Sequence, residues 1–345
     1  MGTADRARPA PGRVDPADRK LADGVRARDP RALAKAITLV ESSRPDHQGR
    51  AEALLARLAP HAGRSFRIGV TGAPGAGKST FIESFGLFLT ARGHRVAVLA
   101  VDPTSALSGG SILGDKTRMD RLARDPNAFI RPSPSGGTPG GVAHKTREAM
   151  LVCEAAGHDV VIVETVGVGQ SETAVAGMTD CFVFVALPNA GDDLQAMKRG
   201  VLELVDVVAV NKADIDPAAA ELARAQLANA LAMLPQRAGA WTPPVVALSA
   251  LKSEGIEALW HEAERFRATL EASGALAAKR RRQALDWLSA IVEHELRTRF
   301  YRHPAVRQAL AAVRAAVAEG SLTPAAAAAK LLLLAKSDET ADERR

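Results

Sequence analysis

The chain has 345 residues, 47% of them hydrophobic and 24% charged, and a formal net charge of +6 at pH 7. This composition is typical of a soluble protein with one large α/β domain and additional helices, or with two small domains, and its apolar runs are too short to span a bilayer. Basic residues are scattered among acidic ones and only 4% of the chain is aromatic, so few side chains could stack on bases and we expect no nucleic-acid partner.

The N-terminal segment, residues 1–65, is expected to form a helical extension that is disordered up to about residue 28. Residues 1–20 contain no apolar run, so we expect no secretory signal. Asp29 followed by Pro30 is typical of a helix start, because proline fits the first helical position. The apolar residues that then repeat at helical spacing are Leu33, Ile37 and Val40, and in a second helix Leu54, Leu55 and Leu58.

From Phe66 onward, short apolar runs rich in β-branched residues alternate with helical stretches of a dozen or more residues. This alternation predicts a mostly parallel sheet with helices on both faces, in a domain that covers residues 66–275. In such sheets, ligands bind beyond the carboxyl ends of the strands. The expected strands are 66–71, 95–101, 159–164, 181–187, 206–210 and 244–248.

After about residue 275 the strand patterns stop and amphipathic helices follow. We expect a helical arm over residues 276–337 and a disordered tail over 338–345. The apolar faces must be buried, either against the central domain or against a second copy of the chain. The residues that define these faces are Leu285, Leu288, Val292 and Leu296, then Val306, Leu310, Val313 and Val317, with Thr323 and Pro324 at the start of a third helix.

The two cysteines, Cys153 and Cys181, lie in unrelated segments. This usage indicates a reducing, cytoplasmic environment without a disulfide framework. No histidine pairs with a cysteine or another histidine at zinc-ligand spacing, so we expect no protein-held transition metal. Because the apolar runs are too short to span a bilayer, we also expect no membrane partner.

The stretch GVTGAPGAGKST contains Gly72-x-x-x-x-Gly77-Lys78-Ser79 directly after a predicted strand and at the start of a predicted helix. Glycines let the backbone wrap around phosphates with its N–H groups pointing inward. Lys78 would reach the β- and γ-phosphates and act in catalysis, and Ser79 would ligate Mg²⁺. A glycine-rich turn without a ligand is the alternative, which the strand–loop–helix context disfavours. The expected nucleotide-binding residues here are Gly72, Ala73, Pro74, Gly75, Ala76, Gly77, Lys78, Ser79 and Thr80.

A second motif, Asn211-Lys212-x-Asp214, follows a later strand and indicates guanine. The carboxylate of Asp214 would accept from the ring N–H and the exocyclic amine of guanine, whereas adenine offers a ring acceptor there. Asn211 would steady the base-binding loop, and the stem of Lys212 would lie against the ring. The stretch ALSALKSEG fits a further backbone contact to guanine from Ser249, Ala250 and Leu251. We therefore expect GTP and GDP as ligands.

Carboxylates end two other predicted strands. Strand 159–164 ends at Glu164, with Gly167 three residues later, where nucleotide hydrolases often carry Asp-x-x-Gly; the acid faces Mg²⁺ and the glycine responds to the γ-phosphate. Asp102 ends another strand and Asp115 follows in the same loop, which suits a Mg²⁺ ligand and a water-holding group. The alternative for this pair is an Asp-Pro turn and a helix cap.

Together these motifs resemble the MeaB/ArgK-type GTPases of the SIMIBI class of P-loop proteins, which include partners of adenosylcobalamin-dependent methylmalonyl-CoA mutase. The resemblance covers about residues 30–335. It depends on the stretches GAPGAGKST, VDPTSALSGGSILGDKTRM, ETVGVGQSE, AGDDLQAMKRG and NKAD, and on RFYRHPAV and GSLTPAAAA near the C-terminus.

The resemblance implies that Glu164 in place of aspartate is normal in this branch and that Asp102 and Asp115 face Mg²⁺. It also makes AGDDLQAMKRG a third switch, in which Lys198 would meet the phosphates or a switch carboxylate when a partner binds. Lys198 on the solvated face of a capped helix is the alternative. Ras-like proteins place a water-orienting Gln where this chain has Val168, and Gln170 lies beyond it. We therefore expect slow hydrolysis alone and faster hydrolysis with a partner.

The sequence favours a homodimeric GTPase chaperone that gates adenosylcobalamin delivery to, and protects, an acyl-CoA mutase. Three alternatives stay open. They are an accessory kinase of basic amino-acid transport, a nickel or zinc insertase of the same GTPase class, and a GTP-binding scaffold without catalysis.

Overall fold

The computed structural model describes residues 16–42, 44–101, 119–132, 139–165, 170–188, 199–233 and 241–336. The chain divides into two compact units, Met1–Gln283 and Ala284–Arg345. Our expected boundary between a central domain and a helical arm, at residue 275, stays a prediction; the division between the two units falls eight residues later, within one long helix.

The first unit is built on a parallel sheet with seven strands in the part of the chain that the structure describes, ordered β3-β2-β4-β1-β5-β6-β7. The predicted α/β class and the six predicted strands are confirmed, with ends that differ by one residue. The seventh, β3, was not predicted, because its four residues include only two strand formers, Phe129 and Ile130, followed directly by an arginine. The strands are β1 (Phe66–Gly72), β2 (Val96–Val101), β3 (Ala128–Arg131), β4 (Val160–Thr165), β5 (Cys181–Ala186), β6 (Val207–Val210) and β7 (Val245–Ala247).

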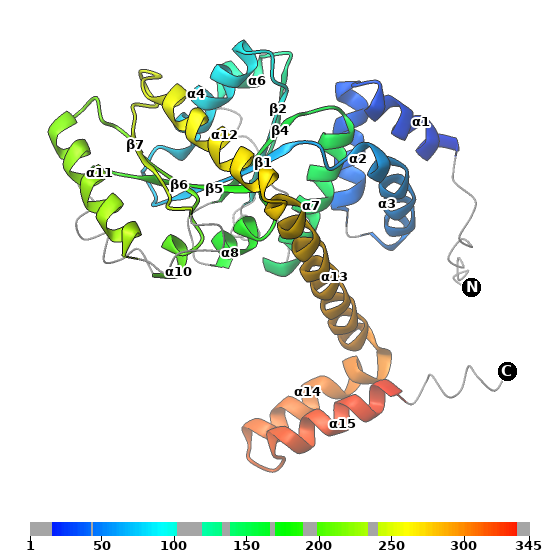
Figure 1. The fold of residues 1–345 in the computed structure, drawn as a ribbon. Coiled ribbons are helices and arrows are strands. Elements are labelled where there is room, and N and C mark those ends of the chain that lie inside the picture. The colour runs from blue at the N-terminus through cyan, green and yellow to red at the C-terminus, as the bar shows by residue number, and fades with distance from the viewer. Residues whose placement is uncertain are drawn as a thin grey trace. The chain divides into compact units, whose positions relative to one another are not determined.

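Helices cover both faces of this sheet, as the alternating pattern predicts (Figure 1). Because successive side chains of a strand point to opposite faces, every described strand except β1 contributes to both hydrophobic cores, and β1 contributes to one. The core on one face includes α4 (Lys78–Ala91), α6 (Asp120–Ala123) and α12 (Ile256–Ala272). The core on the other face includes α7 (Pro139–Ala155), α8 (Gln170–Ala176), α10 (Arg199–Leu202), α11 (Pro217–Ala232) and the N-terminal helices.

Three N-terminal helices precede the sheet: α1 (Pro16–Arg26), α2 (Pro30–Glu41) and α3 (Pro45–Leu58), followed by the 3-10 turn η1 (Ala59–His61). The predicted cap of α2 is confirmed, since the Asp29 side chain accepts from the Arg31 N–H at 2.9 Å. The expected disorder up to about residue 28 is wrong for α1. Five of its eleven residues are charged, which hid the helix, but Val25 is fully buried and the buried Asp18 pairs with Arg50 of α3 at 2.7 Å.

Polar contacts fasten the start of α13 (Ala275–Arg302) to the amino ends of the strands. The Arg280 guanidinium donates to both carboxylate oxygens of Asp180, at 2.8 and 2.6 Å, and to the carbonyls of Gly63 and Ser65. Asp180, which directly precedes β5, is fully buried and also accepts from the Arg67 N–H. Three parts of the chain that lie far apart in sequence therefore meet at one carboxylate.

The second unit comprises the rest of α13 with α14 (Pro304–Ala318) and α15 (Pro324–Lys336). Thr323 caps α15 as predicted, accepting from the Ala326 N–H at 3.3 Å. Val306 and Val313 of α14 are buried, whereas the predicted face of α13 is exposed in the single chain. No helix among the described residues is both long and apolar enough to cross a bilayer.

Replacing Arg280 by methionine should lower the free energy of unfolding by about 3 kcal/mol, because it leaves the buried Asp180 carboxylate without its main partner. Urea unfolding followed by circular dichroism measures this. Arg281→Met, at an exposed neighbour on the same helix, is the matched control and should change stability by less than about 0.5 kcal/mol. Equal losses in both variants would contradict a special role for the Asp180 contact.

Candidate nucleotide-binding site

The phosphate loop connects β1 to α4, and two of its glycines are required by close contacts. Gly72 has φ +150°, and a Cβ there would lie 2.2 Å from the Val185 carbonyl oxygen of β5. Gly77 has φ +85°, and its Cβ would lie 2.6 Å from Nδ2 of Asn211. Glycine is therefore needed at both positions for space as well as for backbone conformation. Gly77 caps α4, so the loop lies at the amino end of a fourteen-residue helix, where anions are favoured.

The ammonium group of Lys78 folds back onto this loop. Its Nζ donates to the carbonyl oxygens of Gly72 at 2.7 Å and Ala73 at 3.1 Å. Burial lowers the pKa of Lys78, and the nearby carboxylates of Glu164 and Glu172 oppose that shift. The lysine is thus a partly buried cation held at the position where the motif predicts phosphate.

Ser79 and Glu164 meet beside the loop. Glu164 pairs in register with Val70 of β1, so the end of β4 is adjacent to the start of the phosphate loop. The Ser79 Oγ donates to Glu164 Oε1 at 3.2 Å, and Glu164 is 8% exposed. Two predicted metal ligands from distant parts of the sequence are therefore neighbours. Among the described residues, no group of three or more His, Cys, Asp or Glu side chains could hold a metal ion.

Asn211 connects the phosphate loop to the predicted base-binding loop. Its Nδ2 donates to the Ala76 carbonyl at 2.8 Å, and its Oδ1 accepts from the Ala250 N–H at 2.9 Å. Its side chain is buried, so both amide contacts are made away from water. The two predicted half-sites, for phosphate and for guanine, are thereby held at a fixed separation.

The remaining guanine residues lie around Asn211. Lys212 adopts a left-handed backbone with φ +64°. A hydrogen bond from Ser249 lowers the pKa of the Asp214 carboxyl, and the Ala213 N–H donates to the Leu248 carbonyl at 3.1 Å. Leu251 is 79% exposed. Residues 211–214 and 248–251 therefore lie side by side, as a bipartite base site requires.

Four predicted residues, Asp102, Asp115, Gly167 and Lys198, lie outside the described residues, as does Val168. The structure therefore brings together Lys78, Ser79, Glu164 and the guanine set, and gives no position for the rest of the predicted metal and switch residues. The roles assigned from the motifs stay predictions.

Our sequence prediction missed Glu172, which the structure places near Lys78. Glu172 is 7% exposed and accepts from the Thr71 hydroxyl at 3.0 Å. The sequence offered one signal for this residue: Glu172 is an acid that follows the predicted switch glycine, Gly167, by five residues. Only the packing of α8 against β1 shows that this acid is buried.

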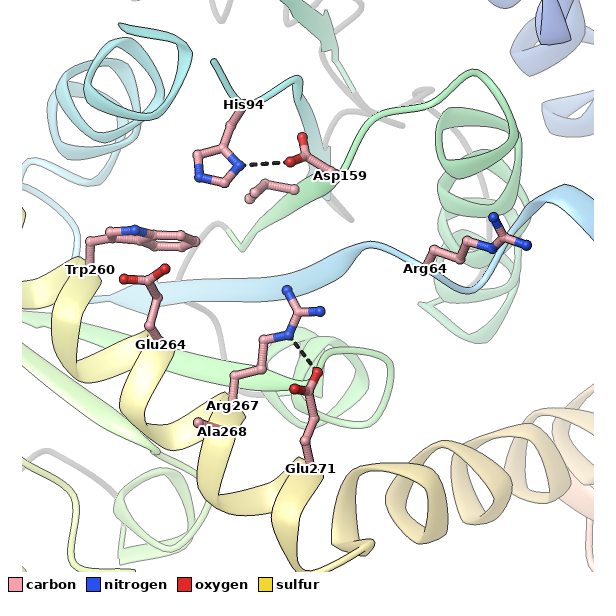
Figure 2. A pocket seen from close by; sticks show the side chains of 9 residues that line it. Arg64, His94, Asp159, Trp260, Glu264, Arg267, Ala268 and Glu271 are labelled. Carbon is pink, nitrogen blue, oxygen red and sulfur yellow. Dashed lines mark hydrogen bonds and ion pairs between the residues drawn. The ribbon is translucent and has the colours of Figure 1, made fainter. Parts of the chain in front are cut away.

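A separate hollow of about 500 Å³ lies at the amino ends of the strands, whereas the predicted nucleotide site lies at their carboxyl ends (Figure 2). Within it, His94 Nδ1 and Asp159 Oδ2 are 2.7 Å apart, and Arg267 donates to Glu271 at 2.8 Å. None of the predicted nucleotide-site residues lines it, so it is distinct from the nucleotide site. Its lining residues are Arg64, His94, Asp159, Val160, Trp260, Glu264, Arg267, Ala268 and Glu271.

The chain is similar to known GTPases. A family model described as methylmalonyl-CoA mutase-associated GTPase MeaB matches residues 33–305. GTPase ArgK of Escherichia coli is 50% identical over 81% of this chain and 83% of its own length. The mouse methylmalonic aciduria type A homolog, a mitochondrial protein, is 45% identical over 92% of this chain and 78% of its own. A crystal structure of an LAO/AO transport system kinase matches with a TM-score of 0.74 and 38% identity, covering 94% of this chain and all of that one.

Replacing Glu164 by glutamine should slow GTP hydrolysis by roughly 10² or more while leaving GDP affinity nearly unchanged, because the variant loses a charge predicted to order the metal and water beside the γ-phosphate. Single-turnover hydrolysis and GDP calorimetry measure the two quantities. An unchanged hydrolysis rate would mean that the acid only ends its strand.

Proposed function

Because the chain belongs to the MeaB family of GTPases, we propose that it gates the delivery of adenosylcobalamin to an acyl-CoA mutase, such as methylmalonyl-CoA mutase, and protects that enzyme. The chain is a GTP hydrolase that binds GTP and GDP. The observation that carries the proposal is the family match over residues 33–305, whose description names association with the mutase. A cytoplasmic location is part of the proposal.

The proposed mechanism begins with the rigid link made by Asn211. Guanine would occupy the loop of Asp214, and the phosphates would then reach the α4 end of the phosphate loop, because Asn211 contacts both loops. Lys78 would exchange its carbonyl partners Gly72 and Ala73 for phosphate oxygens. The backbone N–H groups at the start of α4 add positive potential at the same place.

The residues present fit Mg²⁺. The Ser79 hydroxyl and the Glu164 carboxylate are oxygen ligands of the kind this hard cation prefers, and they are already in contact. We propose that they hold the ion together with Asp102 and Asp115. Mg²⁺ bound there would neutralise charge that develops on the β- and γ-phosphates.

We propose that hydrolysis is slow in the isolated chain and faster in the complex with the mutase. The mutase would press the segment AGDDLQAMKRG inward so that Lys198 stabilises the developing charge. A supplied cationic group of this kind raises GTPase rates by roughly 10³–10⁵.

A second candidate is an accessory role in basic amino-acid transport. It is favoured by one observation, the name of the LAO/AO transport system kinase, whose structure covers 94% of this chain. In that case the chain would respond to a transport protein and not to a mutase.

The two candidates separate in an experiment with an orthogonal nucleotide. Asp214→Asn should prefer xanthine to guanine nucleotides, because the amide donates to the additional ring oxygen. Adenosylcobalamin transfer to apo-mutase, followed by absorbance, should respond to GTP with the wild-type chain and to XTP with the variant. Transfer that responds to neither nucleotide would overturn the mutase proposal, and an effect on lysine or arginine uptake alone would favour transport.

We also propose that the chain dimerises through its C-terminal helices, since α13 exposes an apolar face in the single chain: Leu285 65%, Leu288 57%, Val292 47% and Leu296 62%. A chain that ends at Gln283 keeps the contacts of Arg280 and should be a monomer that binds GDP with wild-type affinity. Light scattering measures the mass of both forms. Monomeric full-length protein at micromolar concentration would contradict the dimer.

A further inference from the structure

Glu172 is a buried carboxylate behind the phosphate loop to which the mechanism above gives no role. It lies in the first turn of α8, and its Oε1 accepts a 3.0 Å hydrogen bond from Thr71 Oγ1. That hydroxyl in turn accepts a 2.8 Å bond from Thr165 Oγ1, and both threonines are fully buried. Because Thr71 directly precedes Gly72, this chain of hydrogen bonds connects α8 to the base of the phosphate loop.

Glu164 and Glu172 approach the phosphate loop from opposite faces of the sheet. Glu164 lies on the same face of β4 as Ile162, which packs in the core of α4, and it accepts from Ser79 of that helix. Thr165 is the next residue, so its side chain points to the other face, where α8 carries Glu172. The two acids therefore lie on opposite faces of the sheet and do not form a single cluster.

Lys78 is the cation that both acids influence. Its Nζ is held by the carbonyl oxygens of Gly72 and Ala73. Burial lowers the pKa of Lys78, and the charges of Glu164 and Glu172 both raise it, so both carboxylates lie within electrostatic range of the ammonium group. Any phosphate that Lys78 contacts would lie within range of Glu172 as well.

We propose that Glu172 is a positioning residue. It is a second counter-charge that draws Lys78 back onto the phosphate loop and so lowers the affinity for bound nucleotide. Its attraction for the ammonium group competes with the phosphate oxygens, and its charge repels them. Salt screens such a buried charge far less than a surface charge. Glu172 therefore favours GDP release. The inference depends on the phosphate-loop part of the proposed function and not on the mutase.

The test is the rate at which GDP leaves Glu172→Gln. The amide has the same shape and can still accept from Thr71, so the fold is kept while the charge is lost. We expect GDP release to slow by roughly tenfold, with a matching gain in affinity, since like charges roughly 12 Å apart repel each other by this amount at an effective dielectric constant of about 20. Stopped-flow release of a fluorescent GDP analogue and thermal unfolding of the nucleotide-free protein are measured together.

Two further variants separate charge from packing. Glu148→Gln removes a largely shielded carboxylate from α7, 12% exposed and paired with His144 and Lys145, and should leave release unchanged. Thr71→Val keeps the Glu172 charge but removes its hydroxyl donor. It should lower the melting temperature without slowing release.

The outcomes are distinct. Unchanged or faster release in a folded Glu172→Gln overturns the inference, and so does slowing of the same size in Thr71→Val, because packing would then explain both. If Glu172→Gln does not fold, Glu172→Asp replaces it. Its carboxylate is set back from Lys78, so release slower than wild type is expected, and equal release contradicts the inference. A wild-type chain that binds no GDP contradicts the site itself.

Discussion

The register of β1 between β4 and β5 is the constraint on which the rest of the site depends. Its pairing with β4 sets Val70 opposite Glu164, and its pairing with β5 sets Gly72 opposite Val185. The first pairing delivers the carboxylate to Ser79, and the second leaves no room for a Cβ at the start of the phosphate loop. A shift of one residue in either pairing would turn every side chain of the strand to the wrong face.

The charged groups at the carboxyl ends of the strands and those at the amino ends have different roles. At the carboxyl ends, Lys78 is partly buried among carbonyls and carboxylates and can exchange these partners for phosphate. At the amino ends, charges are paired within the protein: Arg280 with Asp180, and Arg67 with the buried Glu154 at 2.7 Å. Such buried pairs contribute little net stability compared with apolar packing, but losing one partner is expensive. The Arg280–Asp180 pair therefore acts to specify where α13 leaves the sheet, and the Arg67–Glu154 pair joins β1 to α7.

Asn211 connects the two halves of the predicted nucleotide site. A single amide joins the carbonyl of Ala76 to the N–H of Ala250, and its Nδ2 lies where a side chain at Gly77 would have to be. The glycine of one motif is thus explained by the asparagine of another, 134 residues later in the sequence. Two motifs that lie far apart in the sequence form one structural unit, so a substitution in either motif should alter the conformation of both loops.

Much of this protein could be determined from sequence alone. Alternating apolar runs identified the strands, and the cap at Asp29 identified a helix start. Motifs with strict local geometry, the phosphate loop and Asn211-Lys212-x-Asp214, identified the nucleotide class and the family, because their backbone conformations depend on near neighbours. The tertiary structure decided what depends on distant neighbours. Helix α1 looks polar until its few apolar residues meet α2 and α3, and β3 is a strand only because β2 pairs with it. Glu172 is an ordinary acid in the sequence and becomes a buried charge near Lys78 only when α8 packs on β1, since burial and electrostatic range are properties of the folded chain.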